Sequence, residues 1–259
     1  MKIGLFIPCY VDAVFPEVGM ATYRLLRHLG LDVTYPQGQT CCGQPMANAG
    51  FERQAVPLAQ KFEKLFEGFD YVVSPSVSCT AFIRINYPRL LDHECPTAKR
   101  CMDVVEFLHD VVKLGDTEGT EKTEGSEKRL RLGAFSHKVS LHNSCHGVRE
   151  LGLSSPSEQH VTKFNKIRDL LQLVDGIEVV EPERPDECCG FGGMFSVEET
   201  AVSAQMGRDK VERHIATRAE YVTGPDCSCL MHMEGVARKQ GLNIKFKHVV
   251  ELLAAGLTE

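Results

Sequence analysis

Short apolar runs and longer helical patterns alternate along the chain. The runs fall at 3–9, 31–36 and 71–76, and again at 139–145, 177–182 and 221–226. Runs of this length are typical of strands buried on both faces. Apolar residues at helical spacing lie between them: Val18, Leu25, Leu26 and Leu29; Leu58, Phe62, Leu65 and Phe66; and Phe164, Ile167, Leu170, Leu171 and Val174. The pattern predicts alternating strands and helices.

Local signals mark where several helices begin and end. Pro16 favours a helix start, and Gly30 favours its end. Residues 196–199 read Ser-Val-Glu-Glu, a capping-box pattern that predicts the start of another helix. Alternating strands and helices indicate an α/β fold with mainly parallel sheets and helices on both faces.

The same order of elements occurs twice. SPSVSC (74–79) corresponds to GPDCSC (224–229), and DVVEFL (103–108) corresponds to HVVELL (248–253). A repeat of this length predicts two similar Rossmann-like halves, related by internal duplication and by a pseudo-twofold axis. We expect one half at 1–114 and the other at 130–259. Residues 115–129 are polar, contain several glycines and lack apolar periodicity, so they are predicted to form a linker or loop.

The composition is that of a globular protein. Of 259 residues, 43% are hydrophobic and 25% are charged, which suffices for a proper core. The net charge of −6 gives no electrostatic case for binding nucleic acid or an anionic membrane surface. No apolar run is long enough to predict a transmembrane helix. The first residues carry one Lys and an apolar run interrupted by Pro8, which favours a strand over a signal peptide. We therefore expect a cytoplasmic protein.

Cysteines carry the clearest chemical signal. The chain has 11, and eight of them form two matched sets. The first cysteine group is Cys9, Cys41, Cys42 and Cys79; the second cysteine group is Cys145, Cys188, Cys189 and Cys229. In the cytoplasm, matched cysteines indicate metal binding or catalysis rather than a disulfide framework.

The predicted sheets would bring each group together. We expect Cys9 and Cys145 to close the first strand of each half, and Cys79 and Cys229 to follow a later strand. Ligands of open parallel sheets bind outside the carboxyl ends of the strands. Gly43 or Gly190 would follow the cysteine pair and let the backbone approach a cofactor closely, or adopt a positive φ.

Adjacent cysteines help to choose the metal. Neighbouring side chains diverge, so they suit a polynuclear iron–sulfur cluster better than one tetrahedral zinc ion. We expect one cluster in each half, with zinc as an alternative at one site. The competing interpretation is that these are ordinary buried core cysteines. Cys95, Cys101 and Cys227 fall outside the matched sets and are predicted not to be ligands.

Other polar residues near the cysteines are weaker candidates. His142, His146 and His232 could relay the proton released when a hydroxy acid is oxidised, or hydrogen-bond the sulfurs. Arg149 could pair with a substrate carboxylate, or form an ordinary salt bridge. The glycine-rich segment 190–194 lacks the full spacing of a dinucleotide-binding loop, so no nucleotide cofactor is predicted.

Several longer strings resemble a known family. FIPCYVDAVFPEVG, QTCCGQP, HKVSLHNSCHGVRELG, ECCGFGGMFSV and SCLMHMEG resemble the lactate-utilisation protein A family, which is similar to the cysteine-rich CCG domains of heterodisulfide reductase. The resemblance implies [4Fe–4S] clusters and a part in oxidising L-lactate, a small hydroxy acid, to pyruvate. It also implies two partners: a ferredoxin-like iron–sulfur subunit and a third subunit.

The chain departs from heterodisulfide reductase at one point of the motif. The CCG domains of that reductase end each motif with CxxC, but this sequence has Ser76 and Asp226 where the first of those cysteines would stand. Four cysteines per half therefore remain, and disulfide-reductase activity does not carry over from the resemblance. Two other functions stay open: a zinc-stabilised interaction scaffold, and a thiol–disulfide or quinone-linked reductase subunit of the CCG type.

Overall fold

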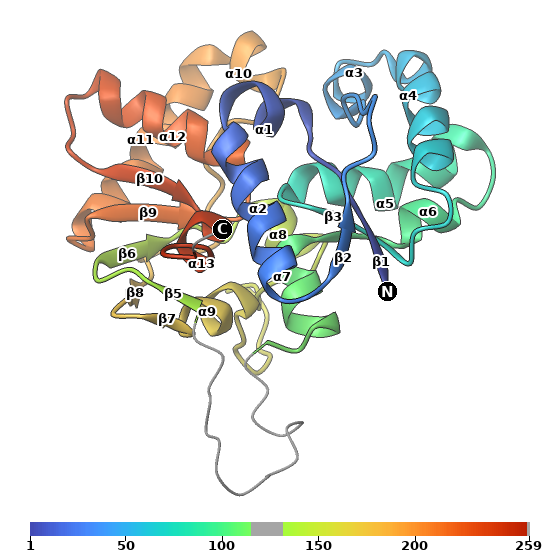
Figure 1. Cartoon of the computed structure of the whole chain (residues 1–259). Helices are drawn as coiled ribbons and strands as arrows, with labels where there is room; N and C mark the ends of the chain where they lie inside the picture. Colours follow the sequence, from blue (N-terminus) through green and yellow to red (C-terminus); the bar gives the residue numbers. More distant parts are fainter. Residues whose placement is uncertain (115–131, 258–259) are drawn as a thin grey trace, which may run out of the picture.

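The computed structural model describes residues 1–114 and 132–257, and its framework is a pair of parallel sheets (Figure 1). The first sheet has the order β2-β1-β3-β4, from β1 (Lys2–Leu5), β2 (Asp32–Thr34), β3 (Tyr71–Ser74) and β4 (Cys101–Asp103). The second has the order β8-β6-β9-β10, from β6 (Lys138–Leu141), β8 (Glu178–Val180), β9 (Tyr221–Gly224) and β10 (Lys245–His248). A short pair, β5 (Leu132–Ala134) and β7 (Val174–Asp175), lies beside them.

The two sheets share one topology. In each sheet, the strand that comes first in the sequence lies between the second and the third strands of that sheet, and the fourth is at the edge. The registers also match, because Ile3 pairs with Tyr71 in the first sheet and Val139 with Tyr221 in the second. The chain is therefore a duplicated α/β fold with mainly parallel sheets, as the sequence predicts.

Helices connect the strands in the same order in both halves. The first half contains α1 (Cys9–Val14), α2 (Pro16–His28), α3 (Gln44–Asn48), α4 (Glu52–Leu65), α5 (Val77–Leu91), α6 (Pro96–Lys99), α7 (Val104–Glu106) and a π-helical turn, η1 (Phe107–Val111). The second contains α8 (Cys145–Arg149), α9 (Lys166–Leu171), α10 (Phe195–Glu198), α11 (Thr200–Ala216), α12 (Cys227–Lys239) and α13 (Val249–Leu253). None of the helices in the described ranges is long and apolar enough to cross a membrane.

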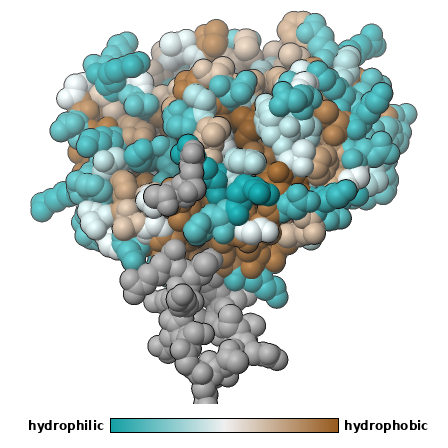
Figure 2. Space-filling view, viewed as in Figure 1, coloured by the Kyte–Doolittle hydropathy of each residue, from teal (hydrophilic) through white to brown (hydrophobic). Residues whose placement is uncertain are grey.

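One central core joins the halves. Buried side chains from α2 and α7 of the first half pack with side chains from α9 and α13 of the second. The repeated strings 103–108 and 248–253 both lie in this core, where each fully buried aliphatic side chain contributes about 1.5–3 kcal/mol. Smaller outer cores cover the other face of each sheet. On the face shown in Figure 2, the surface is mostly hydrophilic, with hydrophobic areas between the polar residues.

A polar contact lies where the carboxyl ends of β3 and β9 meet. Ser76 and Asp226 form an antiparallel bridge between the halves. The Asp226 carboxylate accepts a hydrogen bond from the Ser78 N–H at 2.7 Å and one from the Ser228 N–H at 3.0 Å. One carboxylate thus caps the first turns of α5 and α12 together, which fixes these two helix starts relative to each other.

The positions of Cys9 and Cys145 differ from the prediction that they close strands. Each is instead the first residue of a helix, α1 or α8, a few residues past the end of its strand. Pro8 precedes Cys9 and has no N–H to donate to a sheet, and Ser144 precedes Cys145 with a φ of 60°, outside the strand region. β1 ends at Leu5 and β6 at Leu141, and these two features keep the chain from returning to strand geometry before the cysteine.

Two predicted helices also differ in their limits. The hydroxyl of Ser196 donates to the Gly193 carbonyl within a short helical segment, and the long helix α11 begins only at Thr200. The capping box of the second half lies instead at His248 and Glu251, where a histidine takes the N-cap position. The pattern from Phe164 to Val174 contains the shorter helix α9, and Val174 itself begins β7. The predicted linker at 115–129 lies outside the described residues.

Candidate metal centres

Three separate segments bring the first cysteine group together. Cys9 begins α1, Cys41 and Cys42 lie in the loop before α3, and Cys79 lies in the first turn of α5. The Sγ atoms of Cys9 and Cys41 are 3.6 Å apart, and those of Cys42 and Cys79 are 3.4 Å apart. Residues far apart in the sequence thus present four sulfurs to one place beyond the strand ends.

The second cysteine group has the same arrangement. Cys145 begins α8, Cys188 and Cys189 lie in the loop before α10, and Cys229 lies in the first turn of α12. Interaction with Cys188 is the main cause that raises the pKa of Cys145, and interactions with Cys188 and Cys229 raise the pKa of Cys189, so these sulfurs lie close together. Because both groups use equivalent elements of the repeated fold, the two candidate centres share one design.

A glycine follows each cysteine pair and has a structural requirement there. Gly43 has φ of 90° and Gly190 has φ of 89°, a conformation that side-chain-bearing residues rarely adopt. Their N–H groups donate to the sulfurs of Cys41 and Cys188, each at 3.4 Å. A Cβ on Gly43 would lie 2.9 Å from the Cβ of Ala55. Glycine therefore allows both the tight turn and the N–H···S hydrogen bond.

In each cysteine group, one cysteine has a lowered pKa that favours the thiolate form, and neighbouring cysteines stay protonated as thiols. Hydrogen bonds from Cys42 and Cys9 lower the pKa of Cys41 to about 3, and the matching contacts lower the pKa of Cys188 to about 2. The same interactions, together with burial, raise the pKa of Cys9 and of Cys145. A metal ion can replace the shared protons, and such soft sulfur donors fit iron–sulfur clusters and zinc.

The three remaining cysteines lie in hydrophobic cores. Cys95 and Cys101 are in the outer core of the first half, and Cys227 is in the central core. All three are almost fully buried, and burial is the main cause that raises the pKa of each thiol. Cys42 and Cys79 lie in the same outer core as Cys95 and Cys101, so burial does not separate the two kinds of cysteine, and that these three are not ligands stays a prediction.

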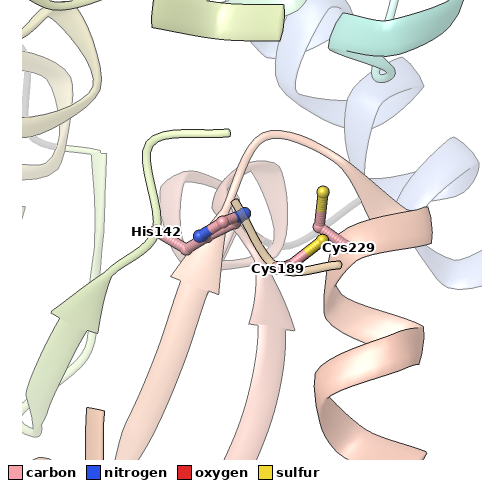
Figure 3. A group of neighbouring side chains, drawn as sticks. All are labelled: His142, Cys189 and Cys229. Carbon is pink, nitrogen blue, oxygen red and sulfur yellow. The ribbon is translucent and has the colours of Figure 1, made fainter. Parts of the chain in front are cut away.

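His142 lies against the second cysteine group. A ring nitrogen of His142 and the sulfurs of Cys189 and Cys229 all lie within 4.8 Å of one another (Figure 3). The side chain is buried, and neither ring nitrogen has a hydrogen-bond partner among the described residues. Burial, followed by the charges of Lys210 and His214, holds the pKa of His142 well below its usual value, so the ring is neutral.

The other sequence candidates lie nearer the surface. His146 bonds to Glu150 at 2.6 Å, and this bond raises its pKa above the usual histidine value. The guanidinium of Arg149 pairs with the Glu158 carboxylate. Both side chains thus have a carboxylate partner, Glu150 for His146 and Glu158 for Arg149.

An aromatic contact connects the neighbourhoods of the two cysteine groups. Tyr10, next to Cys9, packs edge-on against Phe191 with ring centroids 5.9 Å apart. Phe191 follows the second cysteine pair and also contacts the ring of His232 at 6.0 Å. The two candidate centres therefore lie on the same side of the molecule, with aromatic side chains between them.

Sequence reasoning missed Asp226 and the buried pair Lys210 and His214. Asp226 stands where the resemblance leads one to expect a cysteine, and that substitution was a signal of a different role. Lys210 and His214 lie on α11 and are both completely buried. A charged or polar residue at a core position of an amphipathic helix is the signal that could have found them.

Comparisons with known proteins agree with this arrangement. A family model described as CCG, cysteine-rich domain, matches residues 3–84 and 139–234, the segments that hold the two cysteine groups. Lactate utilization protein A of Oceanobacillus iheyensis is 35% identical over 98% of this chain and 96% of its own length. Lactate utilization protein A of an Exiguobacterium species is 36% identical over 100% of this chain and 99% of its own.

A solved structure shares the fold at low sequence identity. The crystal structure of a hypothetical protein from Helicobacter pylori aligns with a TM-score of 0.60 and 8% identity. The alignment covers 100% of this chain and 49% of that one, so this chain spans about half the length of the solved protein. At that identity the likeness concerns the fold alone.

Proposed function

The chain belongs to the lactate utilization protein A family of CCG cysteine-rich-domain proteins, and from this we propose that it is the iron–sulfur electron-transfer subunit of an oxidoreductase complex. We further propose that the complex is cytoplasmic and oxidises L-lactate to pyruvate. The observation that carries the proposal is the pair of equivalent four-sulfur groups. Each gathers at the carboxyl ends of a parallel sheet and holds one sulfur as a thiolate.

The stoichiometry of lactate oxidation fits two such centres. Converting the hydroxy acid to the keto acid releases two electrons and two protons. An iron–sulfur cluster, when bound, accepts and releases one electron at a time. Two centres in one chain can therefore hold both electrons before they leave for a ferredoxin-like subunit. A third subunit completes the proposed complex.

Residues of this chain contribute to holding the clusters and to moving protons. The N–H groups of Gly43 and Gly190 would donate to cluster-bound sulfur, which stabilises the negative charge of a reduced cluster. The bond to Glu150 raises the pKa of His146, with a smaller contribution from the charge of Cys188, and a raised pKa favours His146 as a proton acceptor.

A zinc-stabilised scaffold is the second candidate, and the sulfur spacing supports it. Zinc with bonds of about 2.3 Å in a tetrahedron places its sulfurs about 3.8 Å apart. The Sγ separations of 3.6 and 3.4 Å are close to that value. Against zinc stand the adjacent cysteines, whose side chains diverge, and the duplication of a motif shared with lactate utilization proteins.

Ligand substitution tests which cysteines hold the metal. In anaerobically purified protein, Cys42→Ser and Cys189→Ser should each reduce iron content by one cluster, because each thiolate is a direct ligand. Cys95→Ser and Cys101→Ser, matched changes at buried cysteines of the outer core, should leave iron unchanged. Equal losses from all four variants would contradict the ligand assignment.

A reconstituted complex tests the substrate. The chain combined with its two partner subunits should reduce an artificial electron acceptor with L-lactate, and less well with glycolate. Turnover of disulfides instead of lactate would support a thiol–disulfide reductase. A lack of turnover with lactate, despite full iron content, would contradict the proposed reaction but not the electron-transfer role.

A further inference from the structure

The cores behind the two cysteine groups differ in polarity. In the first half, the ring of Phe6 packs edge-on against Phe62 at 5.2 Å and Phe66 at 5.9 Å. These aromatic side chains fill the outer core between the sheet and α4. On this side the first cysteine group is therefore supported by three phenylalanine rings.

Backbone pairing shows what replaces Phe6 in the second half. The N–H of Phe6 donates to the carbonyl of Val73 at 2.9 Å, just past the end of β1. The N–H of His142 makes the same bond to the carbonyl of Thr223 at 2.7 Å, just past the end of β6. His142 thus occupies the position that corresponds to Phe6.

The other two aromatic residues are also replaced by polar ones. A Cβ on Gly43 would meet Ala55 and Leu58 of α4, and a Cβ on Gly190 would meet Ser203 and Met206 of α11, so Ala55 corresponds to Ser203 and Leu58 to Met206. Phe62 lies seven residues after Ala55, and Lys210 lies seven residues after Ser203, so these two positions correspond. Phe66 and His214, eleven residues along, correspond in the same way, and all four side chains are buried. The second half thus has histidine, lysine and histidine where the first has three phenylalanines.

Two of these three polar side chains have partners elsewhere. The ammonium group of Lys210 donates to the carbonyl of Arg184 at 2.8 Å. His214 Nδ1 bonds to the hydroxyl of Ser140 at 2.7 Å, which leaves its Nε2 without a partner among the described residues. Neither ring nitrogen of His142 has a hydrogen-bond partner among the described residues, although the side chain is only 1% exposed. A buried polar group without a protein partner calls for an explanation such as a bound ion.

The sulfurs of the second cysteine group supply that explanation. The ligand atoms of His142, Cys189 and Cys229 lie within 4.8 Å of one another, and Figure 3 shows the three side chains converging from different segments. A neutral imidazole with a free lone pair is the form in which histidine binds metals. Phe6 offers no donor atom at the corresponding place in the first half.

We propose that His142 is a nitrogen ligand of the metal in the second centre, which makes the two centres chemically unequal. This inference rests on the proposed iron–sulfur function. His142 takes the place of Phe6 and not of a cysteine, so it would be a donor in addition to the four sulfurs of the second group, with no counterpart in the first centre.

Pulsed electron paramagnetic resonance on the reduced, anaerobically purified protein tests the ligand directly. Wild-type protein should show a nitrogen coupled far more strongly than backbone amide nitrogen, and labelling histidine with ¹⁵N should change that coupling. His142→Phe, which copies the first half, should abolish the strong coupling and change the potential of one cluster only. His214→Phe, which copies Phe66, is the matched control and should retain the coupling.

Iron analysis of the same samples separates this inference from the proposed function. Two clusters without a strongly coupled histidine nitrogen would overturn the ligand assignment and leave the electron-transfer role intact. A coupling that survives in His142→Phe but disappears in His214→Phe would overturn it as well. Protein without iron would overturn both. The ¹⁵N-labelling result on the wild type stands even if a variant fails to fold.

Discussion

Replacing Gly43 by alanine should destabilise the protein and distort the turn that holds Cys41 and Cys42 in the first centre. The change places a side chain on a residue with φ of 90°, which costs about 1–2 kcal/mol for the left-handed conformation. The new Cβ would also lie 2.9 Å from the Cβ of Ala55, and overpacking of this kind costs typically about 1–3 kcal/mol. We therefore expect Gly43→Ala to lower the free energy of unfolding by about 2–5 kcal/mol.

Gly50 provides the matched control on the other side of the short helix α3. Its φ is 84°, and a Cβ there would meet nothing within 4 Å, so Gly50→Ala adds the strain without the clash. Its expected loss is about 1–2 kcal/mol. Urea unfolding of both variants measures the difference. Gly43→Ala should also lose the iron of the first centre, because the turn carries Cys41 and Cys42, whereas Gly50→Ala should keep it.

A relieving substitution sharpens this test. Ala55→Gly removes the atom that the new Cβ would strike, so the double variant should be more stable than the sum of the single effects predicts. Equal destabilisation by Gly43→Ala and Gly50→Ala, with iron retained in both, would refute the claim that close packing of the turn holds the centre.

Three further predictions concern the contact between the halves, the proton carrier and the metal-free protein. Asp226→Asn should lower the free energy of unfolding by about 1.5–3 kcal/mol, because the carboxylate accepts charge-assisted hydrogen bonds from both helix starts; an unchanged urea midpoint would count against it. The bond to Glu150 raises the pKa of His146. The contribution of this bond to folding stability is therefore complete below about pH 6.5 and is lost as the pH rises through the raised pKa. Glu150→Gln should return that pKa, followed by NMR titration, toward the ordinary one; a titration identical to wild type would show that the carboxylate is not the cause. Removal of the metal should speed hydrogen exchange at 40–46 and 187–194 while the sheets stay protected, because metal binding and local ordering are coupled; equal protection in both forms would indicate core cysteines and no cluster.

The fold was predictable because its signals are local and repeated. The apolar runs predicted β1, β2, β3, β6, β8 and β9 to within a few residues but not β4, β5, β7 or β10, and the two strings ending in Cys79 and Cys229 revealed the duplication. The place of Cys9 was not predictable from apolar pattern alone. Pro8 reads as part of an apolar run, yet it lacks the N–H that would extend the strand.

The missed parts of the candidate site depend on contacts between distant segments. His142 was a candidate in the sequence, but its burial without a hydrogen-bond partner beside Cys189 and Cys229 becomes apparent only when β6, the second cysteine pair and α12 are placed together. Asp226 acquires its role only when the two halves meet, because one of its hydrogen-bond donors, Ser78, lies in the other half. Neither relation leaves a periodic or spacing signal within one segment of sequence.

Metal identity in anaerobically purified protein tests the central claim most directly. Iron and inorganic sulfide analysis, with visible absorbance and electron paramagnetic resonance after reduction, should show a brown protein with two iron–sulfur clusters per chain. A colourless protein with stoichiometric zinc at the two cysteine groups would contradict the electron-transfer function and establish the scaffold in its place.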